Sequence, residues 1–154
     1  MAKLNDIIGL VEDHPELSNF SGKKAKDQVK EVGIRLNVRL PNDYSAFLEK
    51  FGCGNFGSEE IYGITASHTG IPSVIWATEN ERGADNEFPS EFIVINYSGG
   101  EEIFCLDTSK LYENGICPVV AWPIGGGERD ELEVVANSFT DFVYDIFKDE
   151  IESN

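Results

Sequence analysis

The sequence predicts an α+β fold, a mostly antiparallel sheet with N-terminal helices and a C-terminal helix packed on one face. Three observations support this prediction: helical periodicity comes first, short β-rich runs follow, and an amphipathic helix closes the chain. The strands and helices do not alternate as they do in parallel sheets. No linker or internal repeat interrupts the 154 residues, so one domain over residues 1–154 is expected.

Three helices are expected in the N-terminal third of the chain. The first carries apolar residues at i, i+3, i+4 and i+7 from Leu4 onward, and Pro15 closes it. The second is expected to end at Gly33, and the third to begin at Pro41, whose ring presets φ for a first helical turn. A turn-rich joint, residues 18–22, separates the first two. The expected ranges are 3–13, 23–32 and 41–51.

Short strands dominate the rest of the chain. Ser98-Gly99-Gly100 separates two β-rich runs and predicts a hairpin. A short helix capped by Ser73 is expected over 73–82, and a longer one begins after the cap Ser138. The acidic tail from Asp149 is expected to fray. The expected strands cover 61–64, 92–97, 101–106, 117–122 and 132–136.

Negative charge is unevenly distributed along the chain. The net charge is −16, but residues 1–55 hold eight basic and eight acidic side chains. The remaining four basic and 20 acidic side chains lie in residues 56–154, which therefore carry the whole excess. Such a field repels nucleic acid and anionic lipid and attracts cationic surfaces, although it also serves solubility alone.

The cysteine content and the N-terminus indicate a cytoplasmic protein. Cys53, Cys105 and Cys117 are odd in number and form no C-x-x-C pair, which argues against a disulfide framework or a zinc ribbon. No apolar run is long enough to cross a bilayer. The first residues lack the continuous apolar stretch of a secretory signal.

Motifs for catalysis or cofactor binding are weak. The run at Gly125 lacks the Lys and Ser/Thr of a phosphate loop and precedes three acids. His14 and His68 are far apart in sequence and have no ligand pattern around them. The clustered acids match no calcium loop, and glycosidase carboxylates require a buried member. We therefore expect no enzyme activity, no cofactor and no metal.

Aromatic residues near acidic turns predict a protein-binding surface. Buried aromatic side chains anchor protein interfaces, and surrounding carboxylates steer a basic partner towards them. The four aromatic residues near such turns are Tyr62, Trp76, Tyr97 and Trp122. The residues expected to bind the partner are Glu59, Glu60, Glu101, Glu102, Trp122, Glu128, Asp130 and Glu131.

Several segments together resemble the SUKH superfamily, which includes yeast cell-wall assembly regulators and bacterial toxin-immunity proteins. The core of the resemblance is LPNDYSAFLEKFGCGNFG (residues 40–57) followed by EEIYGI (59–64). FIVINYSGGEEIFCLD (92–107) is similar to the central hairpin of the family, ICPVVAW (116–122) to its next strand, and the closing helix also fits. The size and layout resemble the YobK-type bacterial members.

This resemblance implies an immunity protein that binds and neutralises the C-terminal domain of a polymorphic toxin, often a nuclease. The charge distribution agrees with such a partner, because surfaces that hold phosphates are basic. An interaction hub in cellular regulation is the alternative, and a small-ligand or metal-dependent enzyme is a third. The expected partner is thus a toxin with a basic surface rather than nucleic acid or a membrane, and the oligomeric state stays open.

Overall fold

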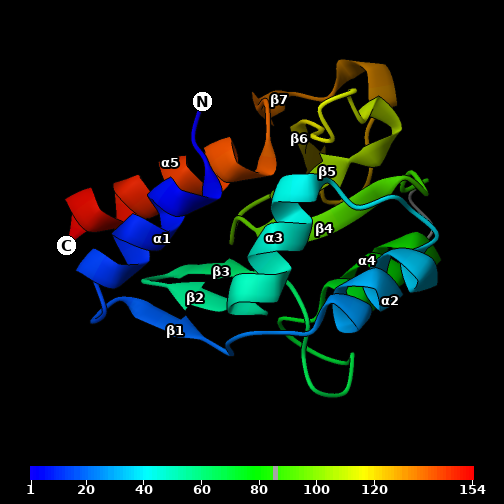
Figure 1. Ribbon diagram of the computed structural model, residues 1–154. Coiled ribbons are helices and arrows are strands. Elements are labelled where there is room, and N and C mark those ends of the chain that lie inside the picture. The colour runs from blue at the N-terminus through cyan, green and yellow to red at the C-terminus, as the bar shows by residue number, and fades with distance from the viewer. Residues whose placement is uncertain (85–86) are drawn as a thin grey trace.

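The computed structural model describes residues 1–84 and 87–154, and it confirms the α+β class. These residues form five α-helices and two antiparallel sheets, ordered β1-β2-β3 and β4-β5-β6-β7 (Figure 1). The helices are α1 (Leu4–Asp13), α2 (Lys26–Leu36), α3 (Asn42–Phe51), α4 (Val74–Gly83) and α5 (Phe139–Ser153). The strands are β1 (Ser18–Phe20), β2 (Gly54–Phe56), β3 (Glu59–Ile61), β4 (Phe92–Tyr97), β5 (Glu102–Asp107), β6 (Val119–Pro123) and β7 (Val134–Ala136).

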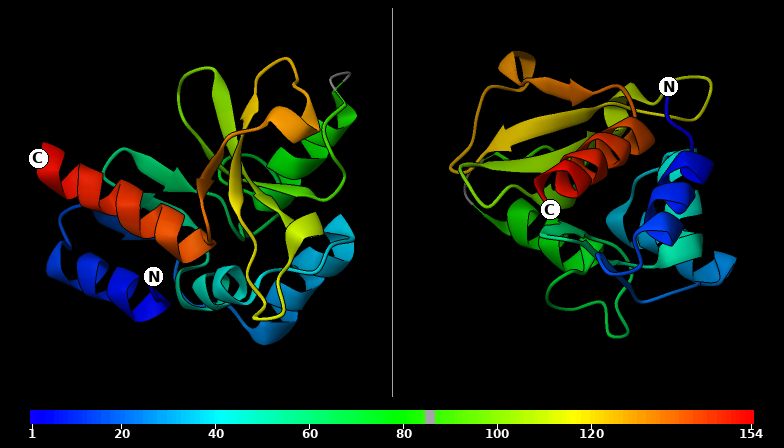
Figure 2. Two further views of the ribbon diagram at one scale, coloured as in Figure 1. Left: turned by 90° about the horizontal axis from the view of Figure 1, so that it is seen from above. Right: turned by 90° about the vertical axis from the view of Figure 1, so that its left-hand side faces the viewer.

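Helix α5 connects the two sheets. Its residue Phe142 packs against Phe104 of β5, with ring centroids 5.2 Å apart. One turn later, Phe147 stacks on Phe56 of β2 at 4.4 Å. Helix α1 lies beside α5, whereas α2 and α4 lie together on the other side of the molecule (Figures 1 and 2). The buried aromatic rings between these elements form the centre of the core.

The small sheet corrects the expectation of a turn-rich joint at residues 18–22. Ser18–Phe20 forms the edge strand β1 by pairing antiparallel with β2, where Ser18 lies opposite Phe56. The β2–β3 turn places Gly54 opposite Ile61. The strand expected over 61–64 ends at Ile61, because the chain then turns towards β4. Both differences reflect pairing between distant segments, which short-range patterns do not reveal.

Helix α2 continues through Gly33, so the expected stop at this residue is wrong. The helix ends at Leu36, and the C-cap residue Asn37 has a left-handed φ of 56°. The amide of Val38 then donates to the carbonyl of Gly33 at 3.0 Å. A Cβ on Gly33 would lie 3.1 Å from the Val38 carbonyl, so glycine allows this close return of the chain.

The acidic tail is helical, and the expected fraying from Asp149 is also wrong. Helix α5 runs to Ser153, and Ile151 packs on the core as a partly buried side chain. Its beginning is as predicted, since the Ser138 hydroxyl accepts a 3.0 Å hydrogen bond from the amide of Asp141. The tail is therefore held at a defined place beside the small sheet.

Candidate protein-interaction surface

Glu59 and Glu60 lie on β3 and are held against the edge of β4. The Asn96 amide nitrogen donates to Glu59 Oε2 at 3.2 Å and to the Glu60 carbonyl at 2.9 Å. The amide of Tyr62 donates to the carbonyl of Ile95 at 2.9 Å. A register shift between Val94 and Asn96 marks this place in β4. Irregular pairing of this kind re-aims a side chain, here towards the two glutamates.

The side chain of Asn96, which lies beside Glu59 and Glu60, has an oxygen atom that accepts no hydrogen bond from the described residues. Its side chain is 1% exposed, and its Oδ1 atom has no hydrogen-bond partner. The amide orientation is fixed, because the Glu59 carboxylate only accepts and must face the Nδ2 donor. A buried acceptor without a donor costs about 1–3 kcal/mol.

The end of α5 adds more negative charge beside Glu59. The Ser58 hydroxyl donates to Glu150 Oε1, which ties the β2–β3 turn to α5. Burial raises the pKa of Glu59; the Asn96 hydrogen bond opposes this, and the nearby Glu150 and Asp149 carboxylates raise it further. Burial also raises the pKa of Glu60. Packing thus brings the like charges of Asp149 and Glu150 close to Glu59.

Glu102 lies on the same face of the larger sheet. Phe104 pairs with Asn96 across the β4–β5 ladder, and Glu102 lies two residues from Phe104 on that face. None of these carboxylates forms a salt bridge within residues 1–84 and 87–154. We call this group the acidic patch: Glu59, Glu60, Glu102, Asp149 and Glu150.

Two tyrosines adjoin the acidic patch. The Tyr62 and Tyr97 rings lie 5.2 Å apart, and the Tyr97 hydroxyl donates to Glu81 Oε2 at 3.3 Å. Burial, reinforced by the charge of Glu60, raises the pKa of Tyr62 to about 12. Both phenols therefore stay protonated at neutral pH and remain hydrogen-bond donors.

The predicted acids of the β6–β7 connection lie at the other end of the larger sheet. Arg129 lies between Glu128 and Asp130 in sequence, and its guanidinium is 3.4 Å from Glu91 and 3.7 Å from Asp107. These partners lie where β4 begins and β5 ends, away from the β4–β5 turn. Glu101 lies in that turn, exposed, next to the acidic patch in sequence. The predicted acids thus form two separate groups, with Glu128, Asp130 and Glu131 in the second.

Trp122 is buried, so its predicted role as an apolar contact for a partner is wrong. It is 1% exposed and packs edge-on against Phe88 and Phe92. The reason is that the rings of Phe88 and Phe92 cover Trp122 on its face of the sheet. Ile124, two residues later and 60% exposed, is the apolar side chain presented by this connection. Trp76 is 38% exposed and lies on α4.

The sequence analysis missed several members of this site. Asp149 and Glu150 were assigned to a frayed tail, although Ile151 continues the apolar spacing of the last helix and signals that the helix extends. Asn96 and Glu81 carry no local signal, because their positions depend on β3 and α4 packing against β4.

Other kinds of site receive no support from the described residues. Residues 1–84 and 87–154 bring together no group of three or more His, Cys, Asp or Glu side chains suited to a metal ion. Across the same residues, every helix is too short or too polar to cross a membrane.

Comparisons with known proteins agree with this architecture. The family model SUKH_5, described as SMI1-KNR4 cell-wall, matches residues 4–148. The chain is also similar to the SPbeta prophage-derived uncharacterized protein YokK of Bacillus subtilis (strain 168). The two are 23% identical over 171 residues, which cover 90% of this chain and 83% of the relative.

Proposed function

Because this chain belongs to the SUKH_5 family of SMI1-KNR4 domains, we propose that it is an immunity protein that binds and neutralises a toxin with a basic surface. The acidic patch carries this proposal. Its five carboxylates come from β3, β5 and α5, Asp149 and Glu150 lie near Glu59, and none of the five forms a salt bridge inside the described chain. The prophage origin of the relative is in keeping with a role in conflict between cells.

The proposed mechanism is stoichiometric binding rather than catalysis. Lys or Arg side chains of the toxin would pair with the patch, and a donor among them would satisfy Asn96 Oδ1 after a small local opening. A nuclease that holds phosphates has such cations at its active site, so the same carboxylates would compete with nucleic acid there. Long-range attraction between the two surfaces would also speed their association.

A growth assay tests the function. The C-terminal domain of any large secreted protein found to be encoded beside this gene is expressed in a bacterial host, with and without this chain. Growth should be arrested without the chain and restored with it. A toxic neighbour that this chain does not relieve contradicts the immunity role, as does the absence of any such gene nearby.

Matched charge reversals locate the contact. Glu60→Lys with Asp149→Lys alters the acidic patch, and Asp130→Lys with Glu131→Lys makes the same charge change at the other end of the sheet. The first pair should slow association with the toxin about tenfold at low salt, and the second should have a smaller effect. If the second pair slows association more than the first, the contact lies at the β6–β7 connection. If both pairs slow association equally, the attraction is non-specific.

The alternative is an interaction hub in cellular regulation, which the cell-wall description of the family favours. A hub would have partners in cells that carry no toxin gene. Affinity purification from cells with the neighbouring toxin gene deleted distinguishes the two functions, since an immunity protein then loses its principal partner.

A further inference from the structure

A cationic groove lies between α2 and α3, on a part of the molecule that the acidic patch does not include. Its volume is about 640 Å³, and its floor is apolar, with Val29, Val38 and Leu40 beside Gly33. Ile34 also lines the groove and is 73% exposed. A smaller hollow shares Val29, Lys30 and Ser45 with the groove, and a third hollow shares Glu49 with the second, so the depression continues along both helices.

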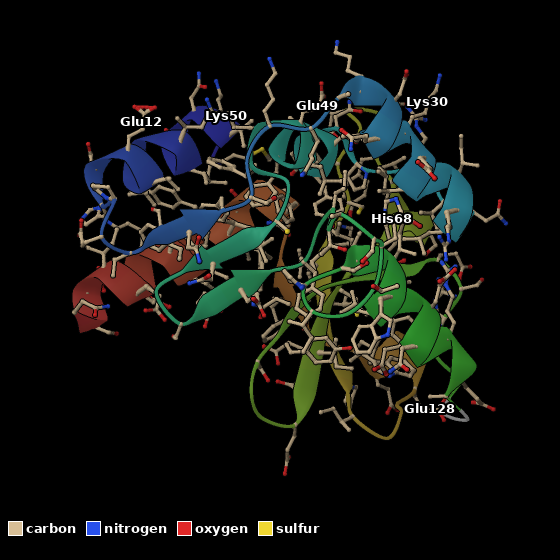
Figure 3. All side chains as sticks on the ribbon, turned by 90° about the horizontal axis from the view of Figure 1, so that it is seen from below. Glu12, Lys30, Glu49, Lys50, His68 and Glu128 are labelled. Carbon is tan, nitrogen blue, oxygen red and sulfur yellow. The ribbon has the colours of Figure 1, made fainter. Side chains whose placement is uncertain are left out.

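Basic side chains surround this groove in a protein of net charge −16. Within residues 1–84 and 87–154, only Arg35 and Arg129 form salt bridges, so the cations of the groove have no ionic partner among those residues. Asp27 and Glu49 are the acids that line it. Figure 3 shows Lys30, Glu49 and Lys50 along one edge of the molecule, with Glu128 on the opposite side. Lys30 and Arg39 line the groove itself, and Lys23, Lys26 and Lys50 line the two hollows that continue it.

We propose that this groove binds an acidic segment of a partner protein that carries apolar anchor residues. The concave apolar floor suits side chains such as Leu or Phe, and the unpaired cations suit the Asp and Glu residues between them. This inference is independent of the proposed immunity function, because it rests on a different surface and the opposite charge.

The observations favour a protein segment over other anionic ligands. Nucleic acid and anionic membranes present dense negative charge without apolar side chains, so neither would use the apolar side chains that line the groove. A second copy of this chain is disfavoured, since two molecules of charge −16 repel each other. An acidic segment with apolar anchors would bury its apolar side chains against those of the groove and would also form ion pairs with the surrounding cations.

Fluorescence anisotropy with a labelled model peptide tests the proposal. In the probe, Leu and Phe are spaced among Asp and Glu; one control peptide has Ser in place of Leu and Phe, and another has Lys in place of the acids. The full chain should bind the probe and bind both controls at least about tenfold more weakly. No binding of the probe at about 1 mM protein in low salt overturns the proposal.

Variants of the chain locate the binding. Lys30→Glu with Arg39→Glu should weaken binding about tenfold, and Ile34→Ser about fivefold, because each removes one of the two attractions. Lys110→Glu with Lys148→Glu makes the same change in net charge on exposed residues outside the groove and should alter binding less than about twofold. Equal weakening by both pairs overturns the proposal, since it would show only the effect of net charge.

Two further measurements identify the occupant. Amide chemical shifts of the labelled protein should change over residues 23–50 when the probe is added, and changes confined to other regions contradict the proposal. Single-stranded RNA and phosphatidylserine vesicles should not bind, and tighter binding of either than of the probe assigns the groove to that ligand instead. Sedimentation should show a monomer; a dimer that Lys30→Glu with Arg39→Glu dissolves assigns it to a second copy.

Discussion

The hydroxyl of Tyr44 donates a 2.8 Å hydrogen bond to the carbonyl of Tyr62, which fixes α3 to the segment that follows β3. Tyr44 is fully buried, and its ring packs against Phe139 with centroids 4.8 Å apart. This hydrogen bond thus ties α3 to the part of the chain that positions Glu59 and Glu60.

Tyr44→Phe should lower the free energy of unfolding by about 1–3 kcal/mol, because it leaves the buried Tyr62 carbonyl without its donor. Chemical denaturation measures the loss. Tyr112→Phe is the matched control, since this tyrosine is 54% exposed and its loss should cost less than about 0.5 kcal/mol. Similar losses at both positions would mean that the hydrogen bond contributes nothing.

Asp43 joins the beginnings of α3 and α5. Its carboxylate accepts hydrogen bonds from the amide of Tyr44 at 2.9 Å and from the amide of Thr140 at 3.2 Å. Asp43→Ala should therefore destabilise the fold by about 1–3 kcal/mol, because both amides lose this acceptor. Asp27→Ala, in the exposed first turn of α2, is the control and should cost less than half as much by thermal unfolding.

Stability should rise as the pH falls from 7.5 to 5.5. Burial raises the pKa of Glu59, Glu60 and Asp43 above their unfolded values, so the folded protein takes up these protons more readily than the unfolded chain. The cost of keeping them ionised is present in full at neutral pH and disappears as the pH falls through the raised values. Glu91 affects stability in the opposite direction. A hydrogen bond with its own backbone lowers its pKa, so its stabilising contribution is present at neutral pH and is lost only as the pH falls below 4.5.

Glu59→Gln should raise the melting temperature at pH 7.5 by roughly 1–3 °C and reduce the pH dependence, because the amide oxygen still accepts from Asn96 without a buried charge. Glu101→Gln, in the exposed β4–β5 turn, should change neither quantity noticeably. Calorimetry at the two pH values measures both. A melting temperature that falls between pH 7.5 and 5.5 would contradict the assignment.

Trp122→Ala should destabilise the protein by about 3–5 kcal/mol, as removal of a buried tryptophan does. Trp76→Ala should cost much less, since that side chain is partly exposed. Tryptophan fluorescence gives a second check: the Trp76→Phe variant, which retains only Trp122, should emit at shorter wavelength than the Trp122→Phe variant. Equal emission maxima would place Trp122 in contact with water.

Local patterns were sufficient for many of the elements. The spacing from Leu4 predicted α1, Ser138 with Asp141 predicted the start of α5, and Ser98-Gly99-Gly100 predicted the β4–β5 hairpin. Each of these signals lies within a few residues, because helix caps, tight turns and amphipathic periods are short-range properties.

The candidate site depended more on the tertiary structure. Sequence placed Glu59, Glu60 and Glu102 among the partner-binding residues, but it treated all the acids of the C-terminal region as one surface. Pairing and packing separated the β6–β7 acids from the rest and buried Trp122 against Phe88 and Phe92. They also brought Asp149 and Glu150, about 90 residues away in sequence, to Glu59.

The sequence by itself determined the family resemblance, the α+β class, most helix and strand positions, and the negative charge of the last two thirds of the chain. Only the tertiary structure decided which charges lie together, which aromatics are exposed, and that a cationic groove exists at all. The physical reason is that hydrogen bonding and periodicity act between near neighbours. Burial and electrostatic grouping instead depend on which distant segments pack against each other.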